Sequence, residues 1–115
     1  MRLSNDGVIQ FRKADRSIWI NGRRLSPRPS QAVRNHSPDG FNWGYCGSGP
    51  AQTALAILLA IGGRRKGWCV RNYQQFKVDV ISYLPQNQDC EIPISVVRQW
   101  VADHTEKEGP GLQPW

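Results

Sequence analysis

A histidine, a carboxylate and a thiol occur close together in the first half of the chain, as His36, Asp39 and Cys46. These are residue types of a nucleophilic site, in which a base activates a hydroxyl or a thiol. Ser37 and Ser48 add hydroxyl groups nearby, and a position just before a helix favours the thiolate form of a cysteine. However, Ser37 and Asp39 are also typical turn residues, so the spacing by itself does not require catalysis.

Anion binding is the second chemistry that this segment suggests. Gly47, Ser48 and Gly49 directly precede the apolar run from Ala51 to Ile61. Unpaired N–H groups and the positive end of a helix dipole would favour a phosphate or carboxylate there. The segment matches neither a Walker loop nor a dinucleotide fingerprint. In the alternative interpretation, Ser48 caps the helix and the glycines only permit a tight turn.

Basic side chains make up the third candidate site. They stand before and after the aromatic residues Phe41, Trp43 and Tyr45, and basic groups beside aromatic rings can follow a phosphate backbone and stack on bases. In the alternative interpretation, these aromatic residues belong to the core, and part of the basic cluster only compensates the negative end of a helix. The candidates are Arg23, Arg24, Arg28, Arg34, Arg64, Arg65, Lys66 and Arg71.

Charge is distributed unevenly along the 115 residues, whose net charge is +6. Residues 1–35 contain eight basic and two acidic side chains, and residues 64–77 contain five basic side chains. Residues 78–115 contain six acidic side chains and only two basic ones. Such a basic face attracts nucleic acid, a nucleoprotein or an acidic protein surface, although an ordinary solvated surface has the same composition.

Cysteine usage argues against a disulfide framework and against a structural zinc site. Cys46, Cys69 and Cys90 are an odd number without a CxxC pair. We therefore predict no metal site and no cofactor. The longest apolar stretch, Ala54–Ile61, is too short to cross a bilayer, and the N-terminus lacks the apolar core of a signal peptide. We expect a soluble, cytoplasmic protein without a membrane partner.

Strand patterns dominate the first part of the chain. Two β-rich runs, 8–11 and 18–20, precede Asn21-Gly22, a strong hairpin signal. They predict a three-stranded antiparallel meander over about residues 7–26. Residues 26–35, with two prolines, predict a loop. The alternation of Phe41, Trp43 and Tyr45 predicts a short strand that joins the sheet as a fourth member.

Helical patterns dominate the rest. A buried helix is predicted from Pro50 to Ile61 and ended by Gly62-Gly63. A second is predicted over about residues 69–84, and a last one is capped by Ser95, after a short extended segment at 90–92. The predicted inner face of the last helix comprises Val96, Val97, Trp100, Val101 and His104.

These patterns together predict one α+β domain over residues 1–104. A small antiparallel sheet of three to four strands would pack on about three helices, with the Pro50–Ile61 helix at the centre. Residues 105–115, which end at Trp115, are predicted to form a flexible tail.

The run from His36 to Leu59 resembles a family of small uncharacterised bacterial domains found in genomes, plasmids and phages. Their typical run is HSPDGFxWGYxGSGPAQ followed by an ALAIL helix, and the resemblance extends over most of residues 7–104. This chain departs from it at Cys46, where glycine is usual, and at Thr53, where leucine is usual. The first departure weighs against Cys46 as a nucleophile. The resemblance implies an accessory protein of a mobile element, some of which act against host defence.

We therefore expect a non-enzymatic module that binds nucleic acid or a protein–nucleic-acid complex through its basic face. An inhibitor of a host defence nucleoprotein, such as an anti-CRISPR protein, would fit the same features. One alternative is a small enzyme or ligand-binding domain with an anionic substrate at Gly47–Gly49. Another is a scaffold that binds only protein.

Overall fold

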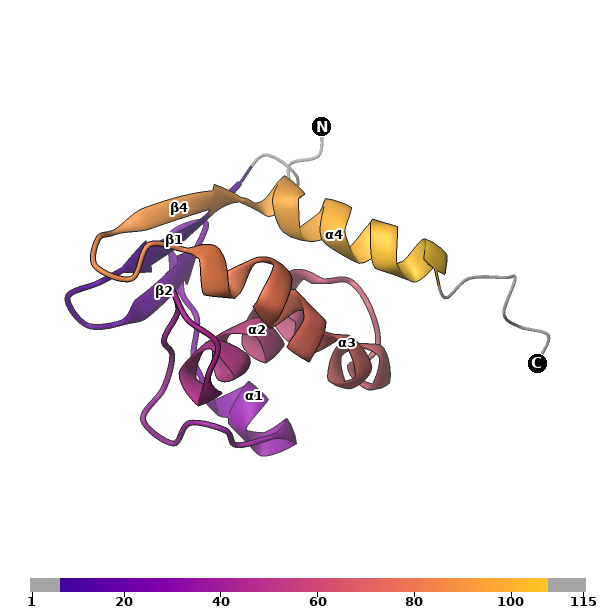
Figure 1. Ribbon diagram of the computed structural model, residues 1–115, viewed down its shortest axis with the longest axis horizontal. Helices are drawn as coiled ribbons and strands as arrows, with labels where there is room; N and C mark the ends of the chain where they lie inside the picture. The colour runs from indigo at the N-terminus through magenta and orange to yellow at the C-terminus, as the bar shows by residue number, and fades with distance from the viewer. Residues whose placement is uncertain (1–6, 108–115) are drawn as a thin grey trace.

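The protein has an α+β fold in which a four-stranded antiparallel sheet packs on helices (Figure 1). The computed structural model describes residues 7–107. The elements in chain order are β1 (Val8–Arg12), β2 (Ser17–Ile20), β3 (Arg23–Arg24), α1 (Arg28–Val33), α2 (Ser48–Ile61), α3 (Lys66–Asp79), the 3-10 helix η2 (Ile81–Tyr83), β4 (Cys90–Pro93) and α4 (Ile94–Lys107). The predicted fold class is confirmed.

The sheet has the strand order β3-β2-β1-β4, with every neighbouring pair antiparallel. Asn21 and Gly22 both have positive φ, 51° and 81°, which is the backbone of the tight hairpin turn that Asn-Gly favours. The Asn21 side chain also accepts a hydrogen bond from the Val8 N–H at 3.1 Å. The predicted three-stranded meander is therefore confirmed, and the extended segment 90–92 forms the fourth strand.

The aromatic segment 41–45 is not a strand, so that prediction was wrong. Its backbone bonds to other parts of the molecule: the N–H of Asn42 donates to Thr53 Oγ1 at 3.2 Å, and that of Gly44 donates to the Ile81 carbonyl at 3.1 Å. Phe41 and Trp43 are nevertheless buried in the core. Tyr45 is 40% exposed, so only the first two side chains fit the core interpretation.

Helix α2 lies at the centre of the domain, as predicted. Ten of its fourteen residues are buried, and it packs against α1, α3, α4 and η2. Its first residue is Ser48 and its N-cap is Gly47. Ser48 therefore does not cap the helix, and Pro50 stands third rather than first. The helix ends before Gly62 and Gly63, and Gly63 adopts a φ of +76°.

The other helices differ from prediction in their bounds. Helix α3 begins at Lys66, three residues early, and ends at Asp79 because η2 follows it. Residues 28–33, predicted as loop, form α1, whose prolines stand where the fixed φ of a helix start suits them. Helix α4 begins at Ile94, so Ser95 lies inside it and does not precede it as a cap.

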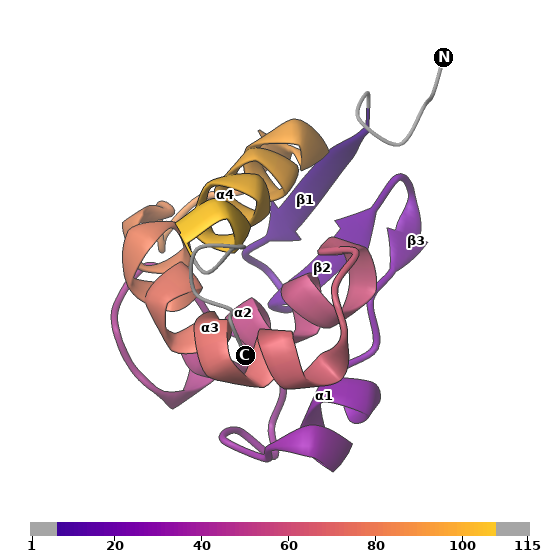
Figure 2. The same cartoon turned by 90° about the vertical axis from the view of Figure 1, so that its right-hand side faces the viewer.

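Helices α1 and α4 lie on opposite sides of α3 in both views (Figures 1 and 2). The inner face of α4 is buried at Val97, Trp100 and Val101, but Val96 is 40% exposed and does not belong to it. The helix continues to Lys107, beyond the predicted domain end. The rest of the predicted tail, 108–115 with Trp115, lies outside the described residues.

Candidate functional site

Three of the predicted basic residues line one hollow where α2 turns into α3. Arg64, Arg65 and Arg71 surround a volume of about 530 Å³ together with Gly63, Gly67 and Trp68. All three arginine side chains are exposed. The Arg64 guanidinium lies 5.9 Å from the centre of the Trp68 ring, close enough for a cation–π contact. The hollow therefore combines free positive charge with one aromatic wall.

Local sequence explains why these side chains meet. Gly63, with its left-handed backbone, ends α2 and turns the chain, and α3 begins three residues later. Arg71 lies one helical turn after Gly67, so the two share a face of α3. Lys66, the fourth basic residue of this segment, is exposed but does not line the hollow.

A second hollow of about 440 Å³ adjoins the first, because both are lined by Gly63 and Arg64. Helix α4 contributes Arg98 to it. A Cβ placed on Gly63 would lie 3.8 Å from Arg98 Nη1. Sequence analysis did not select Arg98, since it stands in the acidic last third of the chain. Only the packing of α4 beside the end of α2 brings it to the basic cluster.

We call Arg64, Arg65, Arg71 and Arg98 the α2–α3 corner. Among the side chains that the structure describes, none of these four forms an ion pair with a carboxylate. The described residues that line the two hollows include no acidic side chain. Within the described part of the chain, no carboxylate therefore pairs with the positive charge at the corner.

The remaining predicted arginines lie elsewhere. Arg23 and Arg24 form β3, and Arg28 and Arg34 stand at the two ends of α1; all four are exposed. Arg24 faces carboxylates, since it lines a hollow of about 110 Å³ with Asp15 and Asp39. Charge on this part of the surface is therefore mixed.

The Asp15 carboxylate is an example of a negative charge beside these arginines. Its pKa is lowered mainly by a hydrogen bond from the Ser17 hydroxyl at 2.6 Å, and the charge of Arg24 lowers it further. Arg24 also lies 5.8 Å from the Trp19 ring centre, while Arg12 lies 4.7 Å from the same ring. These contacts give Arg24 a structural explanation within the sheet.

Gly47, Ser48 and Gly49 stand at the start of α2, where sequence analysis placed an anion site. A Cβ on Gly47 would come within 2.6 Å of the Tyr45 ring, and one on Gly49 within 2.5 Å of Asn42 Cβ. The space left by both glycines is thus occupied by neighbouring side chains. Their small size is explained by this packing, whether or not a ligand binds.

The three predicted catalytic residues have separate surroundings. His36 Nε2 lies 2.6 Å from the Tyr73 hydroxyl, and Asp39 lines the hollow beside Arg24. Cys46 is an exposed free thiol. Among the described residues, no hydrogen bond or ion pair links any two of these three.

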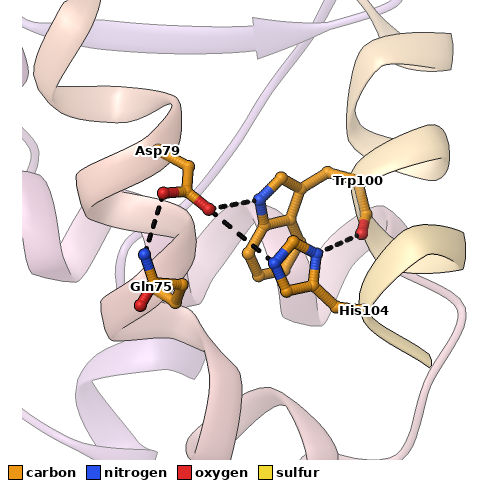
Figure 3. Close-up of polar contacts among 4 residues, drawn as sticks. All are labelled: Gln75, Asp79, Trp100 and His104. Carbon is orange, nitrogen blue, oxygen red and sulfur yellow. Dashed lines mark hydrogen bonds and ion pairs between the residues drawn. The ribbon is translucent and has the colours of Figure 1, made fainter. Parts of the chain in front are cut away.

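A polar cluster that sequence analysis missed joins α3 to α4 (Figure 3). Trp100 Nε1 donates to Asp79 Oδ2 at 2.9 Å, and Gln75 Nε2 donates to Asp79 Oδ1 at 2.8 Å. His104 Nδ1 donates to the Trp100 carbonyl at 2.8 Å, and its Nε2 lies 3.8 Å from Asp79. This cluster holds α4, which carries Arg98, against α3, in addition to the packing of α4 on α2 and β4. No local pattern signals it, because the two helices meet only in the folded chain.

No three His, Cys, Asp or Glu side chains among those that the structure describes, within residues 7–105, are grouped as a metal site would require. Within residues 7–107, no helix has the length and apolar character needed to cross a membrane.

Comparison with known proteins gives a family without an assigned activity. Neither the curated proteins nor the solved structures contain a match to this chain. A family model described as "Family of unknown function (DUF6166)" matches residues 8–103, which include every described strand and most of α4. The chain belongs to this family of unknown function.

Proposed function

We propose that the protein is a non-enzymatic binding protein for nucleic acid or a nucleic-acid–protein complex, which it contacts through the α2–α3 corner. The observation that carries the proposal is the gathering of Arg64, Arg65 and Arg71 around one open hollow without a carboxylate. Each guanidinium that neutralises a phosphate releases condensed counterions, which is the main source of sequence-independent affinity.

The chemistry of arginine supports a phosphate partner. The planar guanidinium stays charged at all physiological pH values and binds two oxygens of one phosphate side by side. Arg98 extends the charge from α3 across the end of α2 to α4. A charged surface built from three elements suits an extended polyanion better than one small ligand.

The separate positions of His36, Asp39 and Cys46 support the non-enzymatic part of the proposal. A nucleophile and its base need to be within hydrogen-bond reach, about 2.6 to 3.2 Å. His36 instead makes its short contact to Tyr73.

We also propose a biological setting, an accessory protein of a phage or plasmid that inhibits a host defence nucleoprotein in the cytoplasm, as anti-CRISPR proteins do. Its support is the resemblance of the His36–Leu59 run to domains of mobile elements, together with the basic corner. A nucleoprotein offers phosphate groups and protein surface at once.

Charge reversal tests the proposal. We expect the triple variant Arg64→Glu, Arg65→Glu, Lys66→Glu to bind fluorescent single- and double-stranded oligonucleotides at least about tenfold more weakly by anisotropy. A matched control is Arg23→Glu with Arg28→Glu and Arg34→Glu, which changes the net charge by the same amount but on β3 and at the ends of α1. Unchanged affinity in the triple variant at residues 64–66 would overturn the proposal.

A pull-down from bacterial lysate with and without nuclease adds a second test. Partners lost after nuclease treatment support nucleic-acid binding. A stable protein partner, together with no oligonucleotide affinity, would replace the proposal with the scaffold alternative.

A further inference from the structure

The first turn of α3 opens onto the arginine-lined hollow. Arg65, the N-cap residue, makes no side-chain capping bond, and the first N–H that donates within the helix is that of Cys69, to the Arg65 carbonyl at 3.1 Å. The N–H groups of Lys66, Gly67 and Trp68 precede that bond and have no acceptor inside the helix. Three backbone donors thus lie beside the three arginines.

Trp68 supplies a second and independent observation. The residue lines the hollow and is only 5% exposed. Its indole N–H is buried, and the described protein atoms offer it no acceptor. Buried donors in native proteins nearly always have a partner, so this unpaired N–H, like that of Trp43 in the core, calls for an explanation such as an ordered water or a ligand.

Gly67 keeps this turn accessible. A Cβ placed there would meet only Arg71 Nη1 within 4 Å, at 3.6 Å, which is an ordinary contact. The space beside Gly67 is therefore not filled by a neighbouring side chain, unlike the space beside the glycines at the start of α2. The missing side chain leaves the backbone N–H groups open to a ligand.

We propose that this hollow binds a phosphate monoester, the chemical group at the 5′ end of a nucleic-acid strand and on a free nucleotide. The proposal deepens the proposed function, because it assigns a specific ligand group to the same corner. Arg64, Arg65 and Arg71 supply guanidinium donors, and the α3 start supplies N–H groups at the positive end of the helix dipole. The dianionic charge of a monoester matches several cations better than a carboxylate does. The hollow of about 530 Å³ is in the size range of pockets that hold small organic ligands.

Inorganic phosphate is the first probe. We would follow the ¹⁵N–¹H spectrum of the full chain while sodium phosphate replaces sodium chloride at constant ionic strength and pH. The proposal expects saturable shifts of the Gly67 and Trp68 amides and of the Trp68 indole. The Trp19 indole, which donates to Ser17 Oγ at 2.9 Å, is an internal control and should not move. Shifts that do not saturate, or that spread evenly over all exposed basic residues, would overturn the proposal.

The source of the phosphate is decided by comparing three ligands. A 5′-phosphorylated oligonucleotide, the same strand with a 5′-hydroxyl, and the matching nucleoside monophosphate would be titrated in turn. We expect the phosphorylated strand to bind roughly tenfold more tightly than the hydroxyl strand. Arg71→Gln should remove this preference while the control Arg28→Gln keeps it. Because Arg71 is exposed, thermal unfolding of the variant should match the wild type.

The outcomes separate this inference from the proposed function. Equal affinity for both strands would overturn the phosphate site but leave nucleic-acid binding in place. Saturable binding of phosphate and nucleotide without any affinity for either strand would support the site and overturn the proposed function.

Discussion

At the scale of single residues, the Gln52 side chain joins helix α2 to α1 and to the loop that follows α1. Its Oε1 accepts hydrogen bonds from the N–H groups of His36 and Ser37, at 2.7 and 3.0 Å. Its Nε2 donates to Ser30 Oγ and to the Arg34 carbonyl, at 2.9 and 3.0 Å. The amide thus uses both of its donors and both of its acceptor positions while fully buried.

Replacing Gln52 should therefore destabilise the whole domain. Gln52→Leu keeps nearly the same volume but leaves buried backbone groups without partners, so we expect a loss of about 3 kcal/mol in the free energy of unfolding. Gln74→Leu on the exposed side of α3 is the matched control, with an expected change within about 0.5 kcal/mol. Urea unfolding followed by circular dichroism measures both. Equal stability of the two variants would show that Gln52 does not hold the loop.

The three thiols should differ in reactivity. Cys46 is exposed, Cys90 is half-buried and Cys69 is fully buried. Burial raises the pKa of Cys69, and burial together with the nearby Asp89 charge raises that of Cys90. Because the thiolate is the reactive form, alkylation at pH 8 should label Cys46 first, Cys90 more slowly and Cys69 last.

Higher pH provides the check on this order. A raised pKa in the folded state stabilises the fold at pH values below the pKa of the unfolded thiol, and this stability is lost as the pH rises through the folded value. Labelling of Cys69 should thus increase steeply above pH 9, when measured by mass spectrometry of the labelled peptides. Labelling of Cys69 at the rate of Cys46 at pH 8 would contradict the described burial.

At the scale of elements, the backbone of Gly44 explains why the aromatic segment 41–45 is not a strand. Its φ is +88°, and an added Cβ would lie 2.7 Å from Gln86 Cβ and 2.9 Å from the Leu84 carbonyl. Gly40 also has a positive φ, +112°, but nothing within 4 Å of an added Cβ. Both glycines have a positive φ, which would strain any residue with a Cβ, but they differ in the space available to one.

Alanine at the two positions separates these effects. Gly40→Ala should cost about 1 to 2 kcal/mol through backbone strain alone. Gly44→Ala should cost about 1 to 3 kcal/mol more, because the methyl group overlaps the segment after η2. Thermal and urea unfolding provide the comparison. Equal losses of stability in the two variants would mean that the 84–86 segment can move away from the added methyl group without cost.

Elements with strong local signals were predictable from the sequence. The Asn21-Gly22 hairpin and the apolar run of α2 each agree with their surroundings, so local preference and tertiary structure coincide there. The structure of the 41–45 segment was not predictable from its alternating aromatic residues. Its backbone N–H groups bond to the Thr53 side chain and to the Ile81 carbonyl instead of to a neighbouring strand. Helix α1 was not predicted, because the two prolines at its start are also typical of loops.

The candidate site shows the same division. Arg64 and Arg65 stand together in the sequence, and their cluster was evident from it. Arg98 was not, because its place depends on how the Asp79–Trp100 contact holds α4 against α3. Contacts between residues far apart in the chain carry no periodicity that a single sequence reveals.

At the scale of the whole molecule, positive charge occupies two regions of different character. The α2–α3 corner has no described carboxylate partner, whereas the β3–α1 region includes Arg24 beside Asp15 and Asp39. Helices α1 and α4 lie on opposite sides of α3 (Figure 2). A rigid ligand that contacts Arg98 on α4 would therefore not also reach α1 without wrapping around the domain.

The salt dependence of binding tests which region contacts the phosphates. Each phosphate contact contributes about 0.7 to 0.9 to the slope of log affinity against log salt concentration. Neutralising Arg64, Arg65 and Arg71 together by glutamine should hence lower that slope by about 2 to 3. The matched triple variant at Arg23, Arg28 and Arg34 removes the same charge but should leave the slope nearly unchanged. Anisotropy titrations from 50 to 300 mM salt measure both slopes, and the opposite ranking would move the binding surface from the corner to the β3–α1 region.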